Sequence, residues 1–202
     1  MVRAANSSSI YAIVLAAGSA TRFGSSKQLA EWNGEMLVRR TTAVAAKSCG
    51  TRTVLVTGHN WNAVYSACKP FSGCFVINEK HTAGIGTSLA LAVRSIRHVA
   101  SAVIVLLADQ PKVSAEHVAT LIEQWSGDER EIVASAYANT SGVPALFASA
   151  SFEKLAALTG DQGARHLLDD PEFKVRHVDF EDAATDIDTV ADLARLSRNA
   201  HS

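Results

Sequence analysis

Short apolar runs alternate with amphipathic segments along the first part of the chain. Runs rich in Val, Ile and Leu predict buried strands at residues 11–15, 53–57, 73–77 and 102–107. Apolar residues at helical spacing predict helices at residues 35–48, 60–68, 84–99 and 114–125. This alternation predicts an α/β fold: a Rossmann-like doubly wound domain with a mostly parallel central sheet and helices on both faces. The most apolar run, residues 102–107, belongs at the sheet centre.

The second half of the chain has a less regular pattern. Strands are predicted at residues 132–137, 143–147 and 174–178, and helices at residues 149–158, 162–169 and 189–197. One of the short strands in this half is expected to run antiparallel. Because no repeat or linker divides the chain, we expect a single domain over residues 10–202, preceded by a flexible tail at residues 1–9.

Composition narrows the classes of protein. A chain of 202 residues with a formal net charge of −1 suits one domain and argues against a general nucleic-acid or membrane-surface binder. No apolar run is long enough to span a bilayer, and residues 1–9 lack the apolar core of a signal peptide. The three cysteines, Cys49, Cys68 and Cys74, lack C-x-x-C spacing, which favours buried or unreactive thiols over a metal site. We therefore expect a cytoplasmic location.

The segment that follows the first strand has the composition of an anion site. Gly18 and Gly24 bracket small hydroxyl residues, and Arg22 and Lys27 add two cations. Backbone N–H groups in such a loop can surround a triphosphate while the cations neutralise its remaining charge. The spacing matches neither the ATPase P-loop nor the dinucleotide pattern G-x-G-x-x-G, and an ordinary turn with solvated charges is the alternative interpretation.

The whole pattern L-A-A-G-x-x-x-R-x-G-x-x-K resembles the signature of the nucleotidyltransferase superfamily, and within it the molybdenum cofactor cytidylyltransferase group. The resemblance implies that this loop binds the nucleotide through Leu15, Ala16, Ala17, Gly18, Arg22 and Lys27. It also gives Arg22 and Lys27 a catalytic role, which is to hold the leaving pyrophosphate.

Two acidic segments are candidates for a metal site. Asp109 follows the most apolar strand, where its carboxylate can bind Mg²⁺ bridging nucleotide phosphates. Asp186 and Asp188 flank Ile187 and point to the same face of an extended segment. The resemblance implies that Asp109, a catalytic residue, and Asp188 are the metal ligands, with Asp186 in a supporting position. The alternatives are that Asp109 caps a turn and that Asp188 caps the last helix.

Three further segments match the family pattern. Asn78, Gly84, Gly86 and Ser88 lie on a loop that leads into a helix, where a nucleobase or ribose can bind; a flexible loop with a Ser/Thr cap is the alternative. The resemblance assigns the acceptor side to two later stretches, G-V-P-A-L-F and G-D-Q-G-A-R, with Gly142, Pro144 and Arg165 as the binding residues. Many members of the family carry His at the position of Val143, so this chain lacks one polar contact of the pattern.

The resemblance implies a Mg²⁺-dependent transfer of CMP from CTP to the terminal phosphate of molybdopterin or the molybdenum cofactor, with release of pyrophosphate. The implied partners are a nucleoside triphosphate, with CTP preferred, a phosphorylated pterin acceptor, and a molybdoenzyme or insertion chaperone. Three alternatives remain: guanylyl transfer to the same cofactor, cytidylyl transfer to another phosphorylated small molecule, and a nucleotide-binding protein without catalysis. A binding protein would not need both Asp109 and Asp188.

Overall fold

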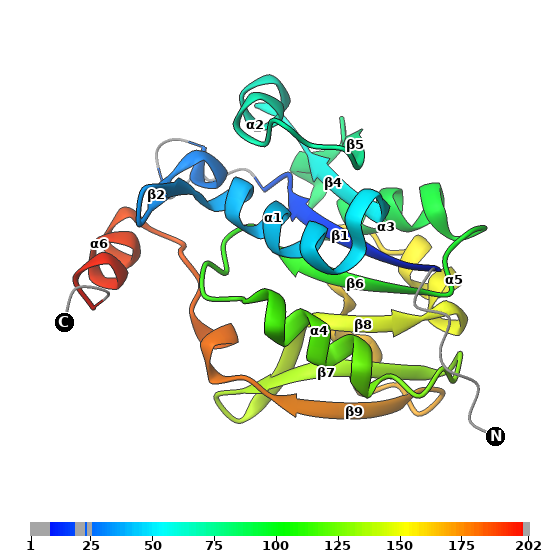
Figure 1. The fold of residues 1–202 in the computed structure, drawn as a ribbon. Helices are drawn as coiled ribbons and strands as arrows, with labels where there is room; N and C mark the ends of the chain where they lie inside the picture. Colours follow the sequence, from blue (N-terminus) through cyan, green and yellow to red (C-terminus); the bar gives the residue numbers. More distant parts are fainter. Residues whose placement is uncertain (1–8, 19–22, 24–25, 200–202) are drawn as a thin grey trace.

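A seven-stranded sheet forms the centre of the computed structural model, which describes residues 9–18, 23 and 26–199 (Figure 1). Its strands are β1 (Ile10–Ala16), β4 (Thr53–Thr57), β5 (Cys74–Ile77), β6 (Ala102–Leu107), β7 (Glu131–Tyr137), β8 (Thr140–Ala148) and β9 (Lys174–Asp179). Their order is β5-β4-β1-β6-β8-β7-β9. Only β8 runs against its neighbours β6 and β7, which confirms the mostly parallel sheet and its one antiparallel strand.

The central strands are apolar on both sides because helices cover both faces. In β1, Val14 packs into one core cluster, and its sequence neighbours Ile13 and Leu15 pack into the other, as the alternation of side chains along a strand requires. Strand β6 lies fourth of seven in the sheet, and its first five residues are at most 1% exposed. The predicted central position of this strand is therefore confirmed.

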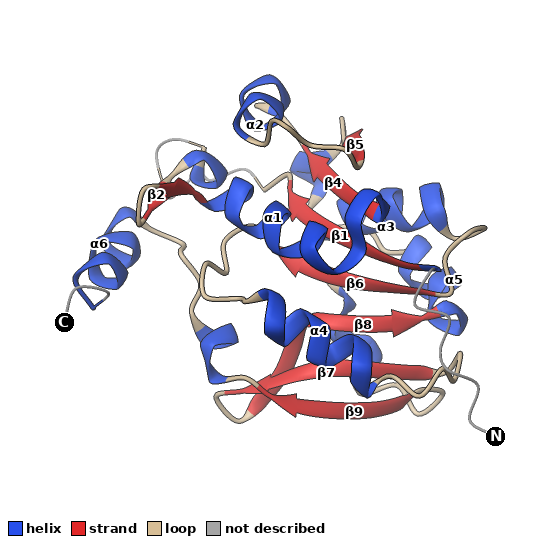
Figure 2. Cartoon of the chain, in the orientation of Figure 1, coloured by secondary structure: helices blue, strands red, loops and turns tan. Residues whose placement is uncertain are grey.

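Helices cover the two faces of the sheet unequally. Helices α1 (Leu37–Cys49), α2 (Trp61–Ala67) and α4 (Ala115–Gln124) contribute buried side chains to the first cluster. Helices α3 (Ile85–Ile96) and α5 (Phe152–Ala156) contribute to the second. Figure 2 shows α1 and α4 in front of the sheet and α3 and α5 behind it. This layered arrangement confirms the doubly wound fold.

A short hairpin that the pattern analysis missed precedes α1. Strands β2 (Glu31–Trp32) and β3 (Glu35–Met36) pair antiparallel, so α1 begins at Leu37 instead of residue 35. Asn33 and Gly34 form the connection with φ values of 53° and 77°, the left-handed geometry that an Asn-Gly hairpin turn requires. The Asn-Gly dipeptide was the available sequence signal.

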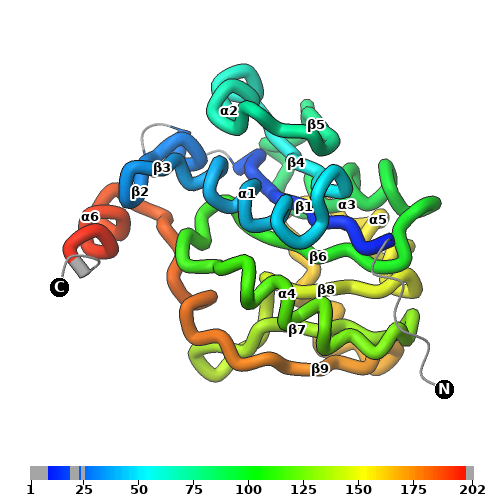
Figure 3. Tube along the Cα trace, viewed as in Figure 1, coloured from blue at the N-terminus to red at the C-terminus, as the bar shows by residue number. Residues whose placement is uncertain are grey.

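The hairpin has its own small core with the C-terminal helix α6 (Val190–Asn199). Trp32 and Leu37 pack with Ile187 and Leu196, and all four side chains are buried. Figure 3 shows the hairpin and α6 side by side at the edge of the molecule. Helix α6 is thus held beside the β2–β3 hairpin, which is far from it in sequence.

The two predicted helices of residues 149–158 and 162–169 are shorter than expected. The first is a 3₁₀ turn (Ser149–Ser151) followed by α5, and the second is a 3₁₀-helix (Ala164–Leu168). Gly160, with a φ of 58°, lies between them and ends regular structure. Apolar spacing alone cannot distinguish such short 3₁₀ segments from α-helix.

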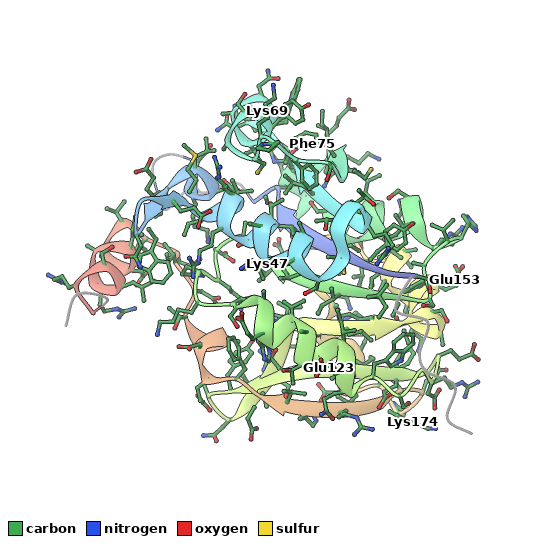
Figure 4. All side chains as sticks on the ribbon, in the orientation of Figure 1. Lys47, Lys69, Phe75, Glu123, Glu153 and Lys174 are labelled. Carbon is green, nitrogen blue, oxygen red and sulfur yellow. The ribbon has the colours of Figure 1, made fainter. Side chains whose placement is uncertain are left out.

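The labelled charged side chains in Figure 4, Lys47, Lys69, Glu123, Glu153 and Lys174, are exposed at the periphery of the fold. Cys49 and Cys68 are buried and Cys74 is exposed, and all three are free thiols. Burial raises the pKa of the Cys49 thiol to about 11. Among the described residues, no helix combines the length and apolar character needed to cross a membrane.

A buried histidine lies between α4 and β7. His117 Nε2 is 2.7 Å from Ser135 Oγ, and the Ser135 hydroxyl donates to the Pro144 carbonyl at 2.6 Å. The imidazole therefore donates from Nε2. Its ring stacks on Phe180 at a centroid distance of 3.7 Å. Burial lowers the pKa of His117 to about 4, so the ring is neutral in the folded protein at neutral pH.

This histidine makes the free energy of unfolding depend on pH. Between its folded pKa of about 4 and its ordinary value of 6.5, the unfolded chain binds the proton and the folded protein does not, so stability falls as pH falls. From pH 7 to pH 5 the loss from this group is about 2 kcal/mol. Urea unfolding at both pH values should show that His117→Gln loses less stability than the parent by about this amount. Equal losses in both proteins would contradict the buried neutral imidazole.

Candidate active site

The loops that follow β1 and β6 meet at the carboxyl-end edge of the sheet, at the left of Figure 1. Ala108 N donates to Leu15 O at 3.1 Å, which joins the two strand ends directly. A cleft of about 540 Å³ opens there, and its walls include Ala17, Gly18, Lys27, Ser88, Asp109 and Asp188. The ends of these two strands therefore share one edge of the sheet, and ligands of open α/β sheets bind at such an edge.

Lys27 connects the two predicted metal-binding carboxylates. Its Nζ donates to Asp109 Oδ2 at 2.7 Å and to Asp188 Oδ1 at 2.9 Å. Burial by itself lowers the pKa of Lys27, but the two carboxylates outweigh that effect and raise it above its ordinary value. Lys27 is therefore a permanent cation in the cleft at physiological pH.

Asp188 reaches the cleft because its neighbour Ile187 is held in place in two ways, by a main-chain hydrogen bond and by burial of its side chain. Ile187 N donates to the Asp109 carbonyl at 3.0 Å. Its side chain is fully buried in the small core with Trp32 and Leu196. In an extended segment the residues on either side of a buried one face the other way, and Asp188 lines the cleft.

Gln110 is a site residue that the sequence interpretation missed. It is 2% exposed, and its Nε2 donates to the carbonyls of Val143 at 3.2 Å and Ala183 at 3.0 Å. It thereby ties the loop of Asp109 to strand β8 and to the segment that carries Asp188. No local motif marks such a residue, because its role depends on two carbonyls that are distant in the sequence.

Asp186 has an unusual charge environment. The residue is exposed on one side, but loss of water around its carboxyl group and the neighbouring carboxylate of Asp109 raise its pKa to about 6. The nearby charge of Lys27 acts in the opposite direction without cancelling the shift. Asp186 is therefore close enough to Asp109 for their charges to interact, although it does not line the cleft itself.

The donor set suits a hard divalent cation. Asp109 Oδ1 is buried and has no hydrogen-bond partner among the described residues, so one oxygen is available for a ligand. Within the described part of the chain, no cluster of three or more His, Cys, Asp or Glu side chains has the arrangement of a metal site. Two carboxylates, with phosphate oxygens and water completing the shell, are the ligands that Mg²⁺ ordinarily takes.

The loop after β5 is organised by Asn78. The residue is 4% exposed; its amide donates to Thr87 Oγ1 and Ser88 Oγ at 2.8 Å each, and its Oδ1 accepts from Lys80 N. Because both ends of this amide are occupied, Asn78 shapes the loop and does not line the cleft. Ser88, Ile85 and His81 from the same region do line it.

Gly84 and Gly86 let the start of α3 pack against a distant backbone. A Cβ on Gly84, which has a φ of 104°, would lie 2.1 Å from the Gly160 carbonyl carbon. A Cβ on Gly86 would lie 2.6 Å from Gln162 O, and Gly86 N donates to Gly160 O at 2.9 Å. The close approach that these glycines allow is therefore to the G-D-Q-G-A-R segment, which brings Asp161 to the cleft wall.

A second, apolar pocket of about 170 Å³ adjoins the cleft, and both contain Leu15, Ile85 and Leu107 in their walls. Gly142 and Arg165, two of the predicted acceptor residues, line it. Gly142 leaves room for Tyr137, whose hydroxyl oxygen would lie 2.5 Å from a Cβ there. Arg165 donates to Thr140 Oγ1 at the rim.

Other predicted site residues lie elsewhere. Pro144 is buried and lines neither pocket, because it follows Val143 on the strand and faces the opposite side. Ala16 packs in the core behind the cleft. Arg22 lies outside the described residues. Gln28, which no motif marked, fixes the start of the loop by donating to Gly18 O at 2.6 Å.

This fold and this cleft together define a nucleotidyltransferase of the α/β type. The chain matches the MobA-like NTP transferase domain over residues 12–178 and belongs to that family. The resemblance found in the sequence is therefore confirmed at the level of the family.

Two proteins are similar to most of this chain. The purine catabolism protein PucB of Bacillus subtilis (strain 168) is 28% identical over 164 residues, which cover 77% of this chain and 78% of PucB. The crystal structure of Rv0371c from Mycobacterium tuberculosis H37Rv is 28% identical, with a TM-score of 0.80, and covers 94% of this chain and 98% of that one. A manganese complex of Rv0371c has a TM-score of 0.78 at the same identity and coverage.

The fold extends to more distant proteins. The molybdopterin-guanine dinucleotide biosynthesis protein A of Archaeoglobus fulgidus has a TM-score of 0.72 at 17% identity, and the match covers 95% of this chain and 98% of that one. The sheet and its helices are therefore shared well beyond the reach of sequence identity.

Proposed function

We propose that this protein transfers CMP from CTP to the terminal phosphate of molybdopterin, or of its molybdenum-bound form, and releases pyrophosphate. The observation that carries this proposal is the pair of adjoining pockets: a polar cleft in which a lysine bridges two carboxylates, beside an apolar pocket with an arginine at its rim. Two substrates bound in pockets that share a wall would meet at that wall, as a group transfer requires.

The polar cleft suits the triphosphate. Lys27 supplies a cation for the β- and γ-phosphates, and Arg22 is proposed to act with it. Asp109 and Asp188 would hold Mg²⁺, which, when bound, neutralises charge on the phosphoryl oxygens. The manganese complex of a 28% identical relative supports a divalent cation in this family. Ala17 and Ser88 line the part of the cleft assigned to the nucleoside.

The apolar pocket suits the acceptor. Leu89, Val105 and Phe147 line it, and the side chain of Tyr137 closes one side. Such walls favour a planar ring system over a fully hydroxylated sugar. Arg165 lies at the rim, and its planar guanidinium group can hold a phosphate with two parallel hydrogen bonds. A phosphorylated pterin has both features.

The chemistry needs no general base. An oxygen of the acceptor phosphate, already an anion, forms the new bond to the α-phosphorus of CTP. The bond between that phosphorus and the oxygen bridging to the β-phosphate breaks, and its electron pair leaves with pyrophosphate. The contribution of the protein is to align the two phosphates and to neutralise the charge that accumulates, which is the usual division of work in phosphoryl transfer.

The base preference is the test of this proposal. Ala17 is 6% exposed, lines the cleft and packs on the second core cluster, so its methyl group narrows the space beside the base. We expect kcat/KM for CTP to exceed that for GTP by at least ~10-fold, which is about 1.4 kcal/mol. Ala17→Gly should reduce this ratio without inverting it.

The measurement is pyrophosphate release with molybdopterin, Mg²⁺ and both nucleotides in competition. A parent enzyme that prefers GTP would replace the cytidylyl assignment with the guanylyl alternative. Turnover with CTP that needs a different phosphorylated acceptor would retain the nucleotide and overturn the pterin. Nucleotide binding without pyrophosphate release, for every acceptor supplied, would leave the non-catalytic alternative.

A further inference from the structure

The ammonium group of Lys27 lies between the two carboxylates that are proposed to hold a divalent cation. The distances from Nζ to Asp109 Oδ2 and Asp188 Oδ1 are 2.7 and 2.9 Å. These are direct, charge-assisted hydrogen bonds. The side chains of Lys27 and Asp109 are only 16% and 25% exposed, whereas that of Asp188 is 59% exposed, so the ion pair with Asp109 is the better shielded from water.

Among the described residues, Lys27 is also the Lys or Arg that lines the cleft assigned to the triphosphate. Two of the three N–H donors of its ammonium group are taken by the carboxylates, so one donor at most is left for a phosphate oxygen while both ion pairs persist. If it moves to the phosphates alone, Asp109 and Asp188 lose their counter-ion beside a triphosphate of the same sign. That arrangement is electrostatically unfavourable in a partly buried site.

We infer that Lys27 stands in for the divalent cation when the site holds none, and that arrival of the cation at Asp109 and Asp188 releases Lys27 to the triphosphate. This inference rests on the proposed function, because it takes the cation site from it. Lys27 therefore competes with the cation for the carboxylates, yet assists the nucleotide.

One consequence is specific to this arrangement. If Lys27 only bound phosphates, its removal would weaken nucleotide binding but would change the affinity for the metal little. If Lys27 only stabilised the fold, its removal would not weaken nucleotide binding specifically. Here, removal of the ammonium group should change the two affinities in opposite directions. It should also weaken the coupling between them, since part of that coupling is the release of Lys27.

The experiment measures binding of Mn²⁺ alone by electron paramagnetic resonance, and then binding of CTP at saturating Mn²⁺ by calorimetry. Lys27→Met should bind Mn²⁺ at least ~5-fold more tightly than the parent and CTP at least ~5-fold more weakly, within the usual range of coupling between sites. Lys27→Arg keeps the charge and should bind Mn²⁺ within about 3-fold of the parent.

Lys112→Met is the matched control, because Lys112 forms an ion pair with Asp182 at 3.0 Å outside the cleft. It should change neither affinity by more than about 2-fold. Asp109→Asn should weaken Mn²⁺ binding in the parent background. If it does so while Lys27→Met binds Mn²⁺ no more tightly than the parent, the stand-in role is overturned and the proposed function survives. If Asp109→Asn leaves Mn²⁺ binding unchanged, the cation site of the proposed function is overturned as well.

Discussion

Asp109→Asn should lower kcat by at least ~100-fold while the fold remains intact, an effect comparable to losing one electrostatic stabiliser of a transition state. The substitution keeps the size of the side chain but removes the charge that faces the cleft. Its carboxylate accepts from Lys27 through one oxygen and has a second, buried oxygen without a partner among the described residues. An amide keeps one oxygen acceptor but loses the negative charge and the second oxygen, so it weakens both the binding of the cation and the ion pair with Lys27.

The measurement is steady-state pyrophosphate release, with circular dichroism to confirm folding. Glu123→Gln, the same chemical change at an exposed position of α4 (Figure 4), is the matched control and should retain parental kcat. Asp188→Asn should lower kcat in the same direction as Asp109→Asn. An Asp109→Asn protein with nearly parental turnover would exclude this carboxylate from the reaction.

Gly84→Ala should lower the free energy of unfolding by about 3 kcal/mol or more, because backbone strain and overpacking each cost roughly 1–3 kcal/mol. Its φ of 104° is a region that residues with a Cβ rarely adopt, and the new methyl carbon would lie 2.1 Å from the Gly160 carbonyl carbon. The contact is with backbone, so no flexible side chain can move aside. For a domain of this size, the melting temperature should fall by roughly 6–12 °C.

Gly163→Ala is the matched control, in the segment against which Gly84 packs. Its φ is −82°, and a Cβ there would meet nothing within 4 Å. Its free energy of unfolding should change by less than about 1 kcal/mol. Urea and thermal unfolding of both variants decide the matter. Equal stabilities for the two would show that the start of α3 can separate from the Gly160 segment at little cost.

Most of the fold could be predicted because the spacing of apolar residues and the enrichment of Val, Ile and Leu in the strands indicate the same elements. The strand at residues 53–57 and the central strand at residues 102–107 have the bounds read from the sequence. The hairpin before α1 was missed because its strands are two residues long, too short for any period to appear. The 3₁₀-helix at Ala164–Leu168 was predicted without its type, because its geometry depends on packing against the sheet and on the glycines before it.

The site could be predicted where chemistry is local in sequence. The family resemblance assigned Lys27 to the nucleotide and Asp109 and Asp188 to the metal, and the structure brings the three within hydrogen-bond distance. It could not reveal that both ends of the Asn78 amide bind partners within the loop, since those partners depend on the path of the loop. It could not reveal Gln110 either, whose two acceptors lie 33 and 73 residues away.

The ion pair between Lys27 and Asp188 joins residues 161 positions apart in the chain. Contacts of such long range require closure of a very large loop, so they form late in folding. The first four parallel strands can pair while Asp188 is still being synthesised, because a ribosome adds roughly 5–20 residues per second from the N-terminus. At this rate, synthesis of the stretch from Asp109 to Asp188 takes on the order of several seconds, and Asp109 and Lys27 can meet before Asp188 exists. The complete pair of carboxylates exists only in chains whose C-terminal segment has docked on the hairpin.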